Sequence, residues 1–596
     1  MLSDTFYVPK QSGTYADAFL VNGLAAILNE IMQRAQGPET YRHINIADLG
    51  SHYQIRLAEP IREEWLERLG FFHSPAFYLL SGGKEETTSL DTNTRNVDET
   101  WAGVRAYAEQ RSALYDQDVK GADIEAQLKD QEPPHDWQVV AFLGDWRMQA
   151  QDIYNRAVSG WTQGKPHFRE YLRALLQLYA APGVDANQIL QEWRKIAKQD
   201  DIPHQDTASQ LLNPHQGKGQ NESKANALRM DNIKDRPWPE EFLKACGLWH
   251  CLAPRKTSDT KDWKVYVIAP RRLTWGAQRE AYRNFNKYLW RERKGDATSL
   301  KTDITSLLLF YKAWLDYVET VHAERDDFDA ELARPEKAIS GFYVAQFKLL
   351  SQNAYTMVNQ SFLSLPAWGG TIQTRSDVTG MKALMDEHLD VIHGIDESHS
   401  DGYDLLHRYR DFVAGENWEA FFDFAASYGH EILRRYNDGD KWVPTFSTIH
   451  LRRLFMNSKK PLSAILEHQG FQNVAAAIRH STVIPQYWKA EIKQGRAQGK
   501  DQFYDVQYGL GAELKRKSTV RDEFVIALTD FMQSYNQKNS QVRESVDAEK
   551  HFKSLRKDLR ESDIEDVISL VDEYGSELVA NLLVAYGYAR ETRDDN

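Results

Sequence analysis

The sequence has very few cysteines, and this scarcity excludes several classes of protein. Two cysteines occur in 596 residues, Cys246 and Cys251, and both lie in the segment CGLWHC with His250 between them. A small secreted domain stapled by disulfides needs more. Two thiols and one histidine make a structural zinc site only with distant ligands. We therefore favour reduced thiols in a protein core and keep a metal site as the alternative.

Long apolar runs are absent as well. No stretch of about 18 consecutive apolar residues occurs, so the sequence predicts no membrane-spanning helix. The first residues, MLSDTFYVPKQSG, have neither the basic region nor the apolar region of a secretory leader. We therefore expect a cytoplasmic protein, and its length predicts two or more domains.

The signatures of common enzymes are missing too. Gly82-Gly83-Lys84 lacks the first half of a P-loop, and neither G-x-S-x-G nor H-E-x-x-H occurs. The segment MDEHLDVIHGIDESH gathers ligand-type side chains at His388, His393, Asp396 and His399. Such side chains would suit a metal-dependent nuclease. Because Gly394 interrupts a single ligand-bearing face, we predict a protein without catalytic activity or cofactor and keep the nuclease as an alternative.

Charge is distributed unevenly along the chain. The net charge is −13, but residues 451–560 carry +8, so the remainder carries −21. Such an asymmetry is typical of a chain in which one region binds a polyanion. A basic face that only contacts water would give the same composition. The cations expected to contact nucleic-acid phosphates are Arg479, Lys489, Lys493, Arg496, Lys515, Arg516, Lys517 and Arg521.

A second basic group follows near the end of this region. The spacing of Lys553, Arg556, Lys557 and Arg560 predicts that they lie along one side of a helix.

Three segments of the basic region carry a family resemblance. They read AAAIRHSTV (475–483), YGLGAELKRKS (508–518) and EFVIALTDFMQSYN (523–536). These segments resemble the small-subunit module of type I CRISPR surveillance complexes, known as Cascade. In that family the module is a helical bundle, and in several subtypes it lies at the C-terminal end of the large subunit. The whole chain is similar in size and order to the large subunit of a type I-B-like complex.

This resemblance implies a set of partners and a division of labour. Such a large subunit clamps the 5′ end of the guide crRNA with a neighbouring subunit, reads a protospacer-adjacent motif in duplex DNA and helps to separate the strands. Its bundle helps to hold the displaced strand of the R-loop. It also recruits a helicase–nuclease or a transposition adaptor, and backbone, handle-binding and small subunits complete the complex. Guide pairing supplies the sequence reading, so the protein needs a short-motif reader and a basic channel.

The segment from Asn213 to Asn226 is the best candidate for the motif reader. Its carboxamides donate and accept hydrogen bonds as base edges require, and its glycines allow close backbone approach. A flexible linker has a similar composition. The residues expected to contact DNA are Gln216, Gly217, Lys218, Gly219, Gln220, Asn221, Lys224 and Asn226, with Arg271 and Arg272 as further candidates.

The periodicity of apolar residues outlines the rest of the chain. We predict a helix over 15–35, a hairpin over 43–58, a strand or buried turn over 137–143, helices over 152–198 and 304–322, a strand over 263–268 and mainly helical structure over 341–437.

Together these patterns predict a mixed α/β N-terminal domain, a mainly helical middle and a C-terminal α-helical bundle. We place the recognition domain at 1–345, a connecting region at 346–445 and the small-subunit-like bundle at 446–596, with the last boundary at the polar break 436–445. Met456 is a candidate internal start for a separately made small subunit. A helical scaffold that binds only proteins is a further functional alternative.

Overall fold

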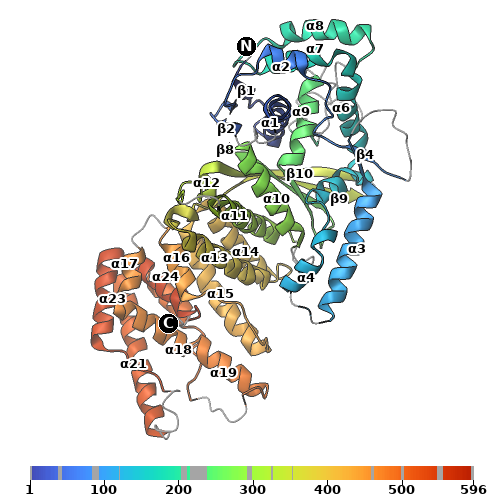
Figure 1. Cartoon of the computed structure of the whole chain (residues 1–596). Coiled ribbons are helices and arrows are strands. Elements are labelled where there is room, and N and C mark those ends of the chain that lie inside the picture. The colour runs from blue at the N-terminus through green and yellow to red at the C-terminus, as the bar shows by residue number, and fades with distance from the viewer. Residues whose placement is uncertain are drawn as a thin grey trace. The chain divides into compact units, whose positions relative to one another are not determined.

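The computed structural model describes residues 3–37, 43–82, 93–117, 119, 121–202, 211–214, 238–291, 298–323, 327–351, 354–457, 462–497, 503–545 and 555–591. The chain divides into two compact units. Unit 1 comprises residues 1–302, 309–327 and 335–365, and unit 2 comprises 303–308, 328–334 and 366–596. Within the described residues every strand belongs to unit 1, so the predicted fold class, mixed at the N-terminal side and helical at the C-terminal side, is confirmed (Figure 1).

Unit 1 mixes short strands with helices. Its strands are β1 (Thr5–Pro9), β2 (Asn45–Asp48), β3 (His52–Arg56), β4 (Tyr78–Leu80), β5 (Thr94–Asn96), β6 (Leu252–Lys256), β7 (Trp263–Pro270), β8 (Arg272–Thr274), β9 (Ile339–Ser351) and β10 (Ala354–Ser364). Its helices are α1 (Tyr15–Gln36), α2 (Glu63–Arg68), α3 (Val97–Tyr115), α4 (Gly121–Gln127), α5 (Trp137–Leu143), α6 (Gln151–Gln163), α7 (Phe168–Leu178), α8 (Ala186–Gln199), α9 (Trp238–Gly247), α10 (Trp275–Arg291) and α12 (Pro335–Ala338), and α11 (Ser299–Ala323) has residues in both units.

Two antiparallel sheets and one parallel strand pair organise these elements. The first sheet has the order β1-β3-β2-β8, and its β2–β3 hairpin confirms the hairpin predicted over 43–58. The second sheet has the order β10-β9-β7-β6, and the strand predicted at 263–268 is its β7. Strands β4 and β5 form the parallel pair.

Helices α1 and α9 pack against each other through glycine. A Cβ atom at Gly23 would lie 1.8 Å from the carbonyl oxygen of Leu243, and a Cβ at Gly247 would lie 1.8 Å from that of Phe19. The two backbones therefore approach as closely as only glycine permits. Most of α1 is buried, as expected for the helix predicted over 15–35.

Two expectations for apolar segments of unit 1 were wrong. Residues 137–143 form helix α5 and not a strand, because a short apolar run fits a buried helix as well as a buried strand. Residues 339–351 and 354–364 form the long strands β9 and β10 and not helices. Strand β9 lies between β7 and β10, and Phe342, Val344, Ala345 and Phe347 are all buried, so its burial does not alternate as in a one-sided strand.

Unit 2 is built from helices. They are α13 (Arg375–His393), α14 (Ser400–Gly415), α15 (Trp418–Asp438), α16 (Thr448–Phe455), α17 (Leu462–Glu467), α18 (Gln469–Ser481), α19 (Val483–Lys493), α20 (Leu510–Lys517), α21 (Arg521–Ser545), α23 (Glu561–Tyr574) and α24 (Ser576–Gly587). Helix α18 packs against α23 and α24, and α15 packs against α19, α20 and α24.

The division between the units differs from the predicted domain boundaries. It falls after Leu365, whereas residue 346 lies inside β9. Residues 366–596 form one unit without a break at 445, because the chain on either side of that point is joined by backbone hydrogen bonds. The Arg590 N–H donates to the Phe446 carbonyl at 2.7 Å, and the Thr448 N–H donates to the Arg590 carbonyl at 3.0 Å. A product starting at Met456 would lack both of these hydrogen bonds.

Two further findings concern the membrane and the cysteines. Among the described residues, no helix has the length and apolar character needed to cross a membrane. Cys246 and Cys251 are free and fully buried, as expected for core thiols, and burial raises the pKa of Cys246 to about 12.

Candidate nucleic-acid interface

The segment predicted to read the motif is fixed at its base. Asn213 is fully buried, and its amide nitrogen donates to both carboxylate oxygens of Glu241 at 2.8 and 2.9 Å. Its amide oxygen accepts from Lys244 at 2.5 Å. Glu241 and Lys244 belong to α9, and α9 itself begins at Trp238. The described chain thus contacts α9 at Asn213, before residues 215–237, and forms α9 from Trp238, after them.

The eight residues predicted to contact bases, 216–221, 224 and 226, lie outside the described residues. Arg271 and Arg272 are described, and both are exposed where β7 ends and β8 begins. Arg271 donates to the backbone carbonyl of Glu336 at 3.2 Å, and Arg272 lies on β8, at the edge of the first sheet. Their position at the surface is compatible with the predicted contact to DNA.

Five of the predicted phosphate-contacting cations already have acidic partners, and one of them, the buried Arg479, lies 3.6 Å from Glu591. Lys515 pairs with Asp423, Lys517 pairs with Glu523 at 2.7 Å, and Arg496 donates to Glu491 at 2.8 Å. Arg521 pairs with both Asp522 and Asp572. Exposed ion pairs of this kind are weak. The acidic partners lower the positive potential around the four side chains other than Arg479, but those four side chains stay at the surface.

The prediction that Arg479 contacts a nucleic-acid phosphate was wrong. Only 5% of this residue is exposed, and its guanidinium donates to the backbone carbonyls of Ala589 at 2.5 Å and Tyr586 at 2.8 Å. These carbonyls lie at the end of α24 and just after it, where backbone donors run out, although the Tyr586 carbonyl also accepts from the Ala589 N–H at 3.3 Å. Arg479 therefore holds the C-terminal end of the chain against α18 and does not face a phosphate.

The prediction that the second basic group, Lys553 to Arg560, is helical was also wrong for its described part. Residues 555–560 are not helical. The Arg556 guanidinium lies 3.5 Å from the centre of the Tyr504 ring and 5.6 Å from that of Tyr535, and burial lowers its pKa to about 10. Arg556 is thus engaged in packing, because aromatic faces from two other segments cover it.

Three predicted cations remain exposed without a salt bridge among the described residues: Lys489, Lys493 and Arg516. Lys489 and Lys493 are one turn apart on α19. The Lys489 ammonium lies 3.2 Å from the Tyr508 hydroxyl and 5.6 Å from the centre of its ring, and 45% of Tyr508 is exposed. We call Lys489, Lys493 and Tyr508 the α19 face. It combines positive charge with an exposed aromatic ring, as surfaces that bind single-stranded nucleic acid do.

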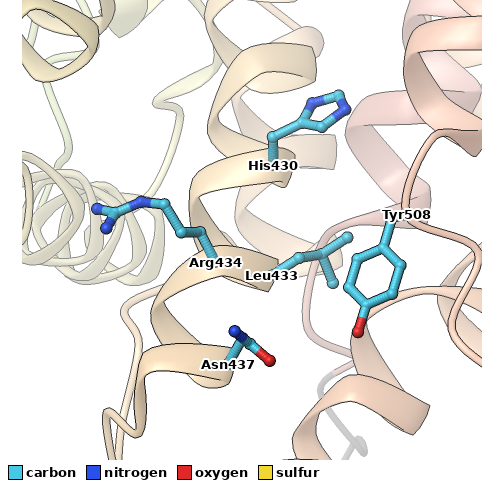
Figure 2. Close-up of a pocket in the computed structure, with 5 residues that line it drawn as sticks. All are labelled: His430, Leu433, Arg434, Asn437 and Tyr508. Carbon is cyan, nitrogen blue, oxygen red and sulfur yellow. The ribbon is translucent and has the colours of Figure 1, made fainter.

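A shallow pocket of about 330 Å³ lies beside Tyr508. Figure 2 shows Leu433 directed toward the Tyr508 ring and the Arg434 guanidinium pointing away from it. Arg434 is paired with Glu431 at 2.6 Å and Asp438 at 3.0 Å. Leu433 and Tyr508 thus form an apolar side of the pocket, and the remaining lining residues, His430, Arg434 and Asn437, are polar. Sequence reasoning did not select Tyr508, because 19 residues separate it from Lys489 and no local spacing joins them.

The proposed metal ligands of the alternative nuclease do not assemble. His388 is fully buried and hydrogen-bonded to the Tyr409 hydroxyl, and burial lowers its pKa to about 3. The side chain of His399 is 78% exposed and lies near Asp396. Within the described part of the chain, no group of three or more His, Cys, Asp or Glu side chains is placed to hold a metal ion.

No protein-family model matches the chain, and no curated protein is significantly similar to it.

Proposed function

We propose that this protein is the non-catalytic large subunit of an RNA-guided DNA surveillance complex. The observation that carries the proposal is the α19 face, where Lys489 lies beside the exposed Tyr508 and Lys493 follows one turn further along α19, both lysines without salt bridges among the described residues. Lysines contact phosphates whatever the sequence, and the ring offers a stacking platform for a base. Unit 2 would accordingly lie along a strand of the guide–target hybrid or along the displaced strand.

A second observation supports the assignment of motif reading to unit 1. Before residues 215–237 the buried Asn213 is bonded to Glu241 and Lys244 of α9, and after them the chain forms α9 itself. A flexible linker between domains would join two different units, whereas this segment leaves and re-enters the same one. Polar segments held on a rigid scaffold are where recognition residues concentrate. We assign the reading of the protospacer-adjacent motif to this segment, assisted by Arg271 and Arg272.

In this role the protein would contact the 5′ end of the guide RNA, open the target duplex and recruit the helicase–nuclease or transposition adaptor. The first experiment is purification of the full chain from cells that express the neighbouring genes. A bound RNA of uniform length, together with neighbouring subunits, is the expected result. Recovery of the chain alone and free of RNA under the same conditions would contradict the proposal.

The second experiment separates motif reading from general DNA affinity. Lys218→Ala and Asn221→Ala should weaken binding of the assembled complex to a motif-bearing duplex by about 1–3 kcal/mol, the value of one good contact to a base edge. Binding to a target already opened into single strands should change little. Lys195→Ala, on the exposed side of α8, is the control. Equal weakening on both targets would show that the segment contributes only charge.

A further inference from the structure

Unit 1 contains a cavity of about 1100 Å³ that nothing in the proposed function uses. Helices α3 and α5, the end of α10 and the strand ends around residues 255–263 surround it. Its aromatic lining includes Trp101, Tyr107, Trp137 and Trp290. A cavity of this size and apolar character is typical of a site for a small molecule or for one residue of a polymer.

The aromatic rings form a connected wall. Trp101 and Trp137 lie 5.7 Å apart between ring centres, Tyr107 and Trp290 lie 5.2 Å apart, and Trp137 and Trp290 lie 6.5 Å apart, all edge to face. Rings in these orientations hold one another in place, so the wall is preformed. A flat aromatic ligand would find both faces and edges to pack against.

Buried polar atoms in the lining have no hydrogen-bond partner. The indole N–H groups of Trp137 and Trp290 and the carboxamide oxygen of Gln138 are all buried and unpartnered among the described residues. Gln138 is only 6% exposed. Unsatisfied buried groups are costly, so these three atoms gain free energy if a partner reaches them. Water does not reach them in the unliganded protein, so a nucleobase edge would pair with them only after binding turns these side chains toward the cavity.

The rim of the cavity is cationic. Arg105 and Arg111 line it from α3, and the described residues include no acidic partner for either one. Lys256 and Arg291 line it from the opposite elements, although Lys256 pairs with Asp145 and Arg291 with Glu132. Glu109 is the one acidic side chain in the described lining. The rim therefore favours an anion next to an aromatic body.

Helix α3, which borders the cavity, buries few of its side chains. Of its 19 residues only Val97 and Tyr107 are buried. An isolated helix of this length has marginal stability in water and depends on contacts along one face. Helix α3 packs against α4 and α5, and its face with Trp101, Arg105, Arg111 and Tyr115 borders the cavity, where a ligand would add further contacts.

We propose that this cavity binds a nucleotide, with the base against the Trp101–Trp137–Trp290 wall and a phosphate at Arg105 and Arg111. The ligand is either a free nucleotide or a single unpaired nucleotide of a strand, since both present the same chemistry. The proposal does not depend on the proposed function, because it concerns unit 1 and would hold if the chain bound no guide RNA.

The test is a titration of the full chain followed by tryptophan fluorescence. The probes are AMP, adenosine, inorganic phosphate and a single-stranded DNA of six adenines. We expect saturable quenching by AMP or by the oligonucleotide and weaker binding of adenosine. Saturation by AMP would identify a free nucleotide as a sufficient ligand, and saturation by the oligonucleotide alone would identify a strand. Absence of saturable quenching with all of them would overturn the proposal.

Variants locate the binding within the chain. Arg105→Glu with Arg111→Glu should weaken binding at least about tenfold, as expected when charge-assisted hydrogen bonds to a phosphate are removed. Both residues lie on a helix with few buried side chains, so the fold should tolerate the change, and an unchanged circular dichroism spectrum would verify it. Gln138→Leu tests the base edge and should weaken the binding of AMP.

The matched control for Arg105→Glu is Lys195→Glu on α8. It makes the same change of charge at a residue that does not line the cavity, and it should leave binding unchanged. Equal weakening by Lys195→Glu and by Arg105→Glu alone would show that only overall charge matters. Tight binding of an apolar peptide that nucleotides do not displace would mean that the ligand of this cavity is a protein segment and not a nucleotide. Either result would overturn the proposal.

Discussion

The two units use the pairing of arginine with an aromatic ring in opposite ways. In unit 2 the Arg556 guanidinium lies 3.5 Å from the centre of the Tyr504 ring, and its pKa is lowered by burial. In unit 1 the Arg111 guanidinium lies 5.6 Å from the centre of the Tyr115 ring at the rim of an open cavity. The first pair is part of a packed interior. The second leaves both the charge and the ring accessible.

Residue type alone therefore does not distinguish structural cations from binding cations. Arg479 and Lys489 lie ten residues apart in the same basic region, yet the first is buried and the second exposed. Part of the positive charge of this region stabilises unit 2 from within, because Arg479 donates to two backbone carbonyls. Inward and outward cations should accordingly respond differently to substitution.

The largest expected effect concerns the buried cation. Arg479→Met should lower the free energy of unfolding of unit 2 by about 3 kcal/mol, because the Ala589 carbonyl loses its charged donor and the Tyr586 carbonyl keeps only the Ala589 N–H. Urea denaturation followed by circular dichroism measures it. Arg516→Met, at an exposed cation of the same region, is the control. A midpoint for Arg479→Met equal to that of the control would mean that Arg479 is not structural.

The next effect depends on pH and concerns a buried anion of unit 2. Burial alone would raise the pKa of Glu387, but hydrogen bonds from His450 and from the Ser447 backbone outweigh it and the pKa is lowered below its usual 4.5. The folded protein thus releases this proton more readily than the unfolded chain does. The stability that Glu387 contributes is fully present above pH 4.5 and is lost as the pH falls through the lower folded pKa.

Glu387→Gln should therefore lower the melting temperature at neutral pH and change it much less at about pH 3, where the wild-type carboxylate is increasingly protonated. The destabilisation at neutral pH should correspond to about 1–2 kcal/mol, the value of a charge-assisted hydrogen bond. Thermal melts of both proteins across this pH range give the measurement. An equal destabilisation at both ends of the range would assign the effect to packing.

A smaller effect compares the two arginine–aromatic pairs directly. Arg556→Leu should cost about 1 kcal/mol of unfolding free energy, since the substitution removes a largely buried cation–π interaction. Arg111→Leu should leave the unfolding midpoint unchanged, because its pair is exposed to solvent. Parallel urea titrations of the two variants test this. A similar destabilisation by both would remove the distinction between the units.

The smallest effect on stability belongs to the α19 face. Lys489→Ala with Lys493→Ala should leave the unfolding midpoint unchanged and make the salt dependence of DNA binding shallower by about two units, one for each phosphate that a lysine no longer neutralises. Binding isotherms at several salt concentrations measure the slope. Lys517→Ala, whose lysine is paired with Glu523, should change it less. An unchanged slope in the double variant would mean that these lysines face only solvent.

Local pattern was enough for much of the fold. The helix over 15–35, the hairpin over 43–58 and the amphipathic helix over 304–322 follow from apolar spacing, and α1, β2–β3 and α11 match them. The burial of both cysteines also follows from residue type, since unpaired thiols are among the side chains most often found inside proteins. Such features depend on neighbours within a few residues, and those neighbours can be read in order along the chain.

The features that sequence pattern did not predict depend on contacts between segments that are distant in the chain. Residues 339–351 form strand β9 because β9 pairs with β7, about 70–85 residues earlier in the chain. Arg479 turns inward because its acceptors lie 107 and 110 residues further along, and the aromatic cavity draws its wall from α3, α5 and α10. The order of residues sets which side chains are available at each point. Packing between elements then sets which of those side chains water reaches, because burial depends on what lies nearby in space and not on what lies nearby in the chain.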